Sequence, residues 1–176
     1  MLITASAASL VIIDMQTRLM PAIDNGDAVL QQCIRLAKIA RLCDIPIIGT
    51  EQSPQKLGNN VEEIRLHCQK TVIKQHFDAC ADGLVDALPP GRTDIIIAGC
   101  EAHVCLMQTA LGLLAQGCRV SVVADAIGSR DPRQKDRAIA RMQAAGTRIV
   151  TVEMVAFESV RTSLHPAFRA VLKLIK

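Results

Sequence analysis

The chain has 176 residues, half of them apolar, and a formal net charge of +3. A chain of this length can bury a full hydrophobic core, and no linker-like stretch interrupts it, so we expect a single domain over residues 1–176. The absence of Trp and Tyr and of any basic run argues against a nucleic-acid partner. No apolar stretch reaches the roughly 18 residues that span a bilayer, and the amino terminus lacks a leader pattern. We therefore expect a cytoplasmic protein with no membrane partner.

Six short apolar segments rich in Val and Ile alternate along the chain with helical patterns. The predicted strands are Ser9–Ile13, Ile45–Gly49, Thr71–Ile73, Asp94–Ala98, Arg119–Ala124 and Thr147–Val152. Strands that are apolar on both faces are typical of a parallel sheet that helices cover on both sides. We therefore predict an α/β fold, a three-layer, doubly wound arrangement around a six-stranded, mostly parallel sheet.

Helical patterns fill the gaps between these strands. The segment from Asp27 to Cys43 places its apolar residues on one broad stripe, and Asp27 is its expected cap. Further helices are predicted at Asn60–His67, Ala102–Gln116, Pro132–Ala145 and Pro166–Ile175, two of which begin with a Pro. The apolar segment from Met154 to Phe157, beyond the last strand, fits either core packing or an interface between subunits.

The seven cysteines are odd in number and irregularly spaced, which does not favour a disulfide framework. Most are expected to be buried small hydrophobic residues. A zinc site would need a converging set such as His67, Cys68, His76 and Cys80, but no C-x-x-C pair occurs and these residues straddle a predicted strand. We therefore expect neither a metal nor another cofactor.

Three polar or reactive residues stand where predicted strands end. Asp14 follows the first strand, Lys74 follows the third, and Cys105 begins the helix after the fourth. Ligands of doubly wound sheets lie beyond the carboxyl ends of the strands, near the point where the strand order reverses. A thiol at a strand-to-helix turn also faces the positive end of the helix, which favours the thiolate. These residues at one sheet edge predict nucleophilic catalysis by the cysteine.

The segments around these residues resemble a known family in order and spacing: Ile12 to Gln16, Val72 to Phe77, Gly99 to Ala110 and Ala124 to Arg130. Together they closely resemble the isochorismatase-like cysteine hydrolase superfamily. The segment from Thr50 to Gly58 and the ending from His165 to Phe168 are similar to its isochorismatase domain-containing subgroup, which has no firmly assigned substrate.

The resemblance implies an Asp-Lys-Cys triad, here Asp14, Lys74 and Cys105. It also implies a cis peptide bond between Cys100 and Glu101, with the backbone N–H groups of Glu101 and Cys105 forming an oxyanion hole. Lys74 is expected to support the thiolate, because an ammonium about 4 Å away supplies about 4 kcal/mol. Asp14 is expected to act as the general base that accepts the thiol proton and later passes it to the leaving group.

The expected reaction is hydrolysis of a small amide-like or carbamoyl C–N bond through a thioester on Cys105. Nicotinamidase relatives carry an Asp-x-His metal motif after the second strand, where this chain has Glu51 to Gln55, so that activity is not expected. Hydrolysis of a vinyl ether by protonation from Asp14 stays open as an alternative. Two non-hydrolytic alternatives are a scaffold that binds a metabolite or a protein, and a redox sensor built on Cys100 and Cys105.

Six residues on loops over the site are candidates for contact with a small-molecule substrate: Gln16, Glu51, Gln52, Phe77, Asp78 and His103. His103 also fits a structural role in which it bonds backbone groups near the turn. Glu51 and Gln52 fit exposed loop positions equally well. Relatives of the superfamily are commonly homo-oligomers, so we expect this chain to associate with itself.

Overall fold

The computed structural model describes residues 2–176, which contain a six-stranded sheet. The strands are β1 (Ala8–Ile13), β2 (Ile47–Gln52), β3 (Lys70–Lys74), β4 (Asp94–Cys100), β5 (Arg119–Gly128) and β6 (Arg148–Val150). They lie in the order β3-β2-β1-β4-β5-β6, and each neighbouring pair is parallel. The order reverses between β1 and β4, so the predicted doubly wound α/β fold is confirmed.

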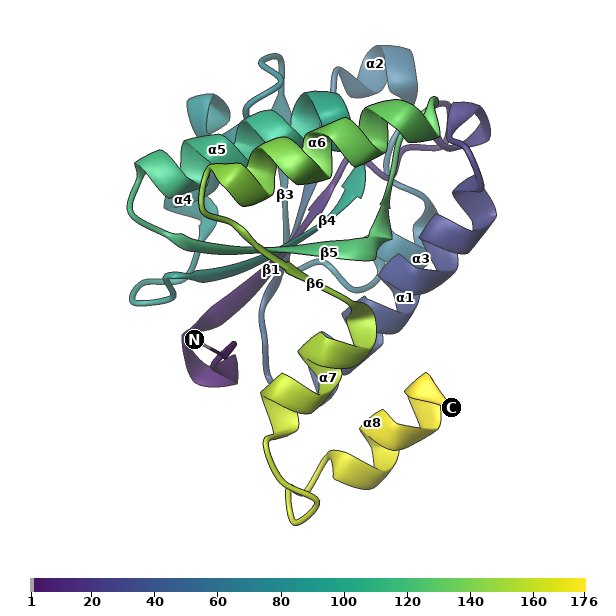
Figure 1. Cartoon of the computed structure of the whole chain (residues 1–176). Helices are drawn as coiled ribbons and strands as arrows, with labels where there is room; N and C mark the ends of the chain where they lie inside the picture. Colours follow the sequence, from purple (N-terminus) through teal and green to yellow (C-terminus); the bar gives the residue numbers. More distant parts are fainter. Residues whose placement is uncertain (1) are drawn as a thin grey trace.

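Helices cover both faces of the sheet (Figure 1). One face carries α5 (Met107–Ala115) and α6 (Pro132–Ala144), and the other carries α1 (Gly26–Leu42) and α7 (Val152–Val160). Outside α1 and α7 lies α8 (Phe168–Ile175). Short helices lie in the connections: α2 (Pro54–Leu57), α3 (Glu62–Arg65) and α4 (Leu84–Ala87). Within residues 2–176, no helix is both long and apolar enough to cross a bilayer.

The start of α1 differs from the prediction. Asp27 does not cap the helix, which begins at Gly26 after Asn25, a residue with a left-handed backbone (φ 50°). Asp27 instead lies in the first turn, where its negative charge still suits the positive end of the helix. Asp24, Asn25 and Asp27 are all polar, so the sequence alone does not show which of them precedes the helix. The left-handed turn at Asn25 decides this.

The last strand is shorter than predicted because the next helix begins at once. β6 ends at Val150, and Thr151 caps α7 by accepting a hydrogen bond from the Met154 N–H at 3.2 Å. The apolar segment after the strand is therefore helical. Val155 is buried in the core, whereas Met154 and Phe157 are 45% and 42% exposed. One side of this helix therefore packs in the core. Its other side leaves Met154 and Phe157 exposed, so an interface between subunits stays a prediction.

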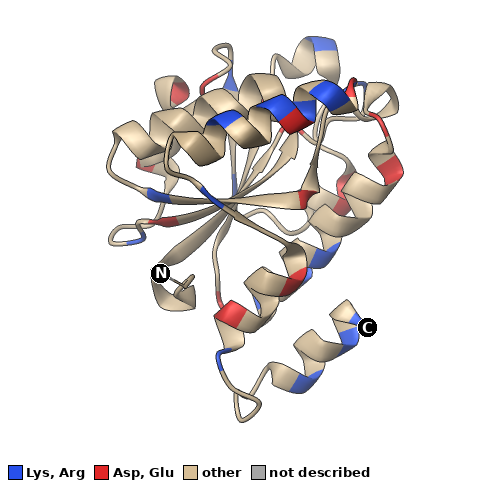
Figure 2. Ribbon diagram, viewed as in Figure 1, with Lys and Arg blue, Asp and Glu red and all other residues tan. Residues whose placement is uncertain are grey.

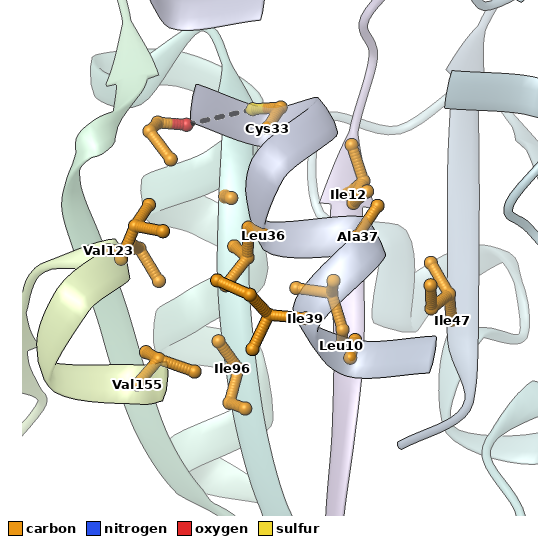
Figure 3. Close-up of a cluster of buried hydrophobic side chains, with 14 of the residues drawn as sticks. Leu10, Ile12, Cys33, Leu36, Ala37, Ile39, Ile47, Ile96, Val123 and Val155 are labelled. Carbon is orange, nitrogen blue, oxygen red and sulfur yellow. Dashed lines mark hydrogen bonds between the residues drawn. The ribbon is translucent and has the colours of Figure 1, made fainter. Parts of the chain in front are cut away.

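Apolar clusters lie on the two faces of the sheet. Because strand residues alternate between faces, β4 sends Ile96 to one cluster and Ile95 and Ile97 to the other. Figure 3 shows the first cluster, in which side chains of α1 such as Leu36 lie against those of β1 and β4. There the Cys33 thiol donates a hydrogen bond to a backbone carbonyl oxygen of β5 at 3.2 Å. Burial raises the pKa of this thiol, as expected for a cysteine that serves packing.

The carboxyl ends of β1 and β4 approach each other closely, where Ile13 pairs with Gly99. Gly99 has φ 112°, and a Cβ atom at this position would overlap the backbone of Ile13. Only glycine fits such a position without strain. Ile13 directly precedes Asp14, so Gly99 lets β4 lie against the residue that leads into the predicted site.

Replacing Gly99 by Ala should lower the free energy of unfolding by about 3 kcal/mol or more, because an unfavourable φ and overpacking each cost about 1–3 kcal/mol. Gly146→Ala is the matched control, since Gly146 has φ 107° but no atom within 4 Å of a Cβ at that position. Urea denaturation of both variants gives the comparison. Equal losses would contradict the close packing of β4 on β1.

Candidate active site

An ion pair links the carboxyl ends of β1 and β3. Asp14 follows β1 directly and Lys74 is the last residue of β3, with β2 between the two strands. Lys74 Nζ lies 2.8 Å from Asp14 Oδ2, and both side chains are fully buried. Asp14 has a left-handed backbone (φ 47°), which aspartate tolerates better than most residues. Two opposite charges buried this deeply need further hydrogen bonds to offset their desolvation.

Side chains of β2 supply those hydrogen bonds. Thr50 Oγ1 donates to Asp14 Oδ1 at 2.6 Å, and Lys74 Nζ donates to Gln52 Oε1 at 2.7 Å. Thr50 and Gln52 are two residues apart, so they project from the same face of the strand. Thr50 is not among the site residues predicted from the sequence. The available signal was a polar residue two positions before Gln52 at the end of an apolar strand.

The connection after β4 turns sharply before the next helix. The peptide bond between Cys100 and Glu101 is cis, and a π-helical turn, η4 (Ala102–Leu106), then leads into α5. The Leu106 N–H donates to the Glu101 carbonyl oxygen at 3.1 Å, and a hydrogen bond between residues five apart is what defines a π turn. The Glu101 carboxylate accepts a hydrogen bond from Arg130 Nε at 2.9 Å, which ties this turn to the residues after β5.

Cys105 lies in this turn, beside the ion pair. Its Sγ is 3.9 Å from Gln52 Oε1, the same oxygen that accepts from Lys74. After burial, the charges of Asp14 and Lys74 have the largest effects on the pKa of the Cys105 thiol, and they act in opposite directions. The structure therefore places Asp14, Lys74 and Cys105 together at one edge of the sheet, near the point where the strand order reverses.

The surroundings of Cys105 favour the thiol over the thiolate. Burial, followed by the negative charge of Asp14, raises the pKa of Cys105 to about 12, although Lys74 acts in the opposite direction. Cys105 is only 7% exposed, so little water is available to solvate a sulfur anion. Burial and Asp14 therefore oppose the thiolate expected from the sequence, and Lys74 offsets them only in part. A thiol in this state needs a base during attack, and Asp14 is the carboxylate beside it.

Cys100 lies away from Cys105 despite the short spacing in sequence. Cys100 belongs to the apolar cluster under α1, whereas Cys105 belongs to the cluster under α5 and α6 on the opposite face. Cys100 Sγ is 4.0 Å from Met20 Sδ, and burial raises its pKa to about 12. A disulfide needs the two Cβ atoms about 4 Å apart, so this placement argues against the redox sensor.

Two of the predicted substrate-binding residues hold other parts of the site in place. The buried side chain of Gln16 accepts from the Gln52 N–H at 2.8 Å and donates to the Gln52 carbonyl oxygen at 3.1 Å. Glu51 projects to the face opposite Gln52, where it accepts from Asn59 Nδ2 at 2.9 Å and from the Asn60 N–H at 2.8 Å. Gln16 thus positions Gln52, and Glu51 fixes the following loop.

Three more predicted residues lie farther along the chain. Asp78 caps the short helix η3 (Ala79–Asp82) by accepting from the Cys80 N–H at 2.8 Å. His103 Nδ1 lies 3.0 Å from Ser129 Oγ, so its partner is a side-chain hydroxyl rather than the expected backbone group. Phe77 is 50% exposed. Of the six predicted substrate residues, Gln52 is the one whose side chain contacts both Lys74 and Cys105.

The zinc set considered from the sequence does not converge. Across residues 2–176, no three His, Cys, Asp or Glu side chains are grouped so that they could hold a metal ion. His76 instead lies 3.1 Å from Asp82. Burial raises the pKa of Cys68 to about 11 and that of Cys80 to about 12, so both thiols hold their protons at neutral pH.

Removing half of the buried ion pair should destabilise the fold more than removing both halves. Lys74→Met leaves Asp14 charged and without its cation, so we expect the free energy of unfolding to fall by about 3–5 kcal/mol. Adding Asp14→Asn to Lys74→Met removes the unpaired charge as well and should recover about 1 kcal/mol or more. Urea denaturation at neutral pH measures both. A double variant no more stable than Lys74→Met would contradict the coupling.

The rate at which iodoacetamide alkylates Cys105 should rise about tenfold per pH unit between about pH 7 and 9. The thiolate is the reactive form, and a raised pKa leaves its fraction far from saturation over this range. Tandem mass spectrometry of the digested protein assigns the adduct to Cys105 among the cysteines of the same peptide, with Cys105→Ser as the blank. A rate that levels off below about pH 8 would instead indicate a stable thiolate.

Comparison with known proteins places the chain in a family. A family model described as the isochorismatase domain matches residues 8–154. Isochorismatase domain-containing protein 1 of Danio rerio is 37% identical over 166 residues, which cover 93% of this chain but only 59% of that protein. Isochorismatase domain-containing protein 2A of Mus musculus is 34% identical over 180 residues, which cover 99% of this chain and 85% of that protein.

A solved structure is also similar. The structure named MAR1 ribonuclease from Caenorhabditis elegans superimposes with a TM-score of 0.94 at 32% identity, covering 99% of this chain and 92% of that one. The chain belongs to the isochorismatase family.

Proposed function

We propose that this protein is a cysteine hydrolase that cleaves a small amide-like or carbamoyl C–N bond through a thioester on Cys105. The observation that carries the proposal is the buried Asp14–Lys74 ion pair beside the Cys105 thiol, with Lys74 and Cys105 both against Gln52 Oε1. A nucleophile, a base in contact with it and a third group that orients the base form the general arrangement of covalent catalysis. Membership of the isochorismatase family supports a hydrolytic reaction.

In the first step, Cys105 Sγ attacks the substrate carbonyl carbon while the thiol proton passes to Asp14. A C–S bond forms and the carbonyl π electrons move to the oxygen. The backbone N–H groups of Glu101 and Cys105 are the proposed donors to this oxyanion. Donors that are already in position when the charge develops stabilise a transition state by about 3–4 kcal/mol each.

The tetrahedral intermediate then expels the amine, which takes the proton from Asp14, and leaves an acyl group on Cys105. Water attacks this thioester and gives a proton to Asp14. When the second intermediate collapses, the C–S bond breaks and the sulfur regains the proton from Asp14. One amide bond and one water are consumed, one acid and one amine are released, and both residues return to their starting states.

Lys74, Gln52 and Thr50 keep Asp14 and Cys105 ready for this cycle. Lys74 and Thr50 occupy one carboxylate oxygen each, at 2.8 and 2.6 Å, which fixes the orientation of the base. Lys74 also acts on the Cys105 thiol in the direction that lowers its pKa, opposite to Asp14. Proton transfer to Asp14 removes the nearby negative charge, so the balance shifts towards the sulfur anion as attack proceeds.

A related structure supports the choice of probe. YcaC from Pseudomonas aeruginosa, 27% identical with a TM-score of 0.91, is named as carrying hexane-2,5-diol and covalent acrylamide. Acrylamide combines an amide with a carbon that adds to thiols. We therefore include it with amides, ureas and carbamates in a screen of this protein, in which intact-mass spectrometry detects adducts on Cys105.

The alternatives give different results in this screen. Vinyl-ether hydrolysis by protonation from Asp14 needs no thiol, so Cys105→Ala would stay active on an ether substrate. A scaffold would show neither turnover nor adduct. The name of the Caenorhabditis elegans structure makes RNA a further substrate to include.

Cys105→Ala should lower kcat/KM on an identified substrate by about 10³-fold or more, since removal of a catalytic nucleophile usually costs at least this much. The melting temperature should stay close to that of the parent. Cys118→Ala is the matched control, because Cys118 is a partly buried cysteine that follows α5, away from the triad. If Cys105→Ala keeps the parental rate, the covalent scheme is wrong.

A further inference from the structure

A cavity of about 830 Å³ lies between the carboxyl-terminal end of α1 and α8. Its wall has a basic part and an apolar part: Lys38, Arg41, His67, Arg169 and Lys173 form the first, and Leu42, Pro166, Ala170 and Leu174 the second. Helix α1 ends where the chain returns to the beginning of β2. The cavity therefore lies towards the amino ends of the strands, whereas the triad lies at their carboxyl ends.

The cations of this cavity are not neutralised by the protein. Among residues 2–176, none of Lys38, Arg41, Arg169 and Lys173 forms an ion pair, and no Asp or Glu belongs to the cavity wall. Figure 2 shows α8 with basic residues and no acidic ones. Like charges three or four residues apart on a helix repel each other, as Lys38 with Arg41 and Arg169 with Lys173 do. A bound anion would relieve this repulsion.

His67 adds a polar atom that lacks a partner. Its Nδ1 is buried and has no hydrogen-bond partner in the described part of the chain. Burial, Arg41 and Lys38 lower the pKa of His67, so the imidazole is neutral at physiological pH. An anion among these residues would offset the repulsion between the cations. The adjoining cavity, which shares Arg41 and His67, has Asp44 in its wall and is therefore less suited to an anion.

We propose that the cavity between α1 and α8 binds a small organic phosphate, a phosphate monoester on an apolar body of one or two rings. A monoester carries a charge of about −1.5 to −2 near neutral pH and three acceptor oxygens, which suits a group of several cations. The apolar body would lie against Leu42, Ala170 and Leu174. A volume of about 830 Å³ falls within the range of about 300–1,000 Å³ that is usual for small-ligand sites.

Titration calorimetry with 1-naphthyl phosphate tests the site without any assay of activity. The unmodified protein should bind the probe, and Arg169→Gln with Lys173→Gln should weaken binding at least about tenfold, because two of the four cations are lost. Arg137→Gln with Arg141→Gln is the matched control. These residues are likewise exposed and four apart, but on α6, and this variant should bind as the parent does.

Two further measurements locate the ligand and identify its class. Ala170→Trp fills the cavity from an exposed position without changing the charge, and should also weaken binding at least about tenfold. Inorganic phosphate should bind the unmodified protein at least about tenfold more weakly than 1-naphthyl phosphate, because it makes no apolar contact. Melting temperatures without ligand check that each variant is folded.

The proposal is overturned if the unmodified protein does not bind the probe. It is also overturned if both double variants weaken binding equally, because that result indicates general attraction by a basic protein. Unchanged binding by a folded Ala170→Trp variant would show that the probe binds outside this cavity. Equal affinity for the two phosphates would exclude an apolar body on the ligand.

Discussion

The buried ion pair between Asp14 and Lys74 is the interaction on which the rest of the site depends. Each charge has left water, so the protein has to offset a desolvation cost of several kcal/mol per ion. It does so with the pair itself and with hydrogen bonds from Thr50 and to Gln52, both on β2. The strand between β1 and β3 therefore holds the two charges at 2.8 Å while keeping water away from them. The same burial raises the pKa of the Cys105 thiol to about 12, with a further contribution from Asp14.

The alternation of side chains along β2 separates two tasks within three consecutive residues. Thr50 and Gln52 face the ion pair, and Glu51 between them faces the opposite side and fixes the loop that begins after the strand. Gln16 then clamps the end of β2 by bonding both backbone groups of Gln52. This clamp sets where the Gln52 side chain lies between Lys74 and Cys105. Residues without a direct chemical role thus determine the geometry of those proposed to react.

Much of this arrangement could be predicted from the sequence. Strands that are apolar on both faces indicated a parallel sheet, and the strand ends indicated where Asp14, Lys74 and Cys105 meet. The protonation state of Cys105 could not be predicted, because its burial and its contact with Asp14 arise when distant segments pack together. Thr50 was missed for the same reason, since its role depends on which strand lies beside β1. Spacing along the chain predicts which residues lie at the carboxyl edge of the sheet. It does not predict which strands are neighbours or which of their side chains point to the same face.

In the proposed reaction, Asp14 holds the neighbouring Cys105 thiol protonated until the carboxylate receives the proton. The most direct test is the ultraviolet absorbance of the Cys105 thiolate as a function of pH, measured as the difference from Cys105→Ala, in the parent and in Asp14→Asn. Burial, followed by the charge of Asp14, raises the pKa of Cys105 to about 12, so replacing Asp14 with Asn should move the thiolate signal to lower pH. An unchanged or higher titration midpoint in Asp14→Asn would show that Asp14 does not hold the thiol protonated.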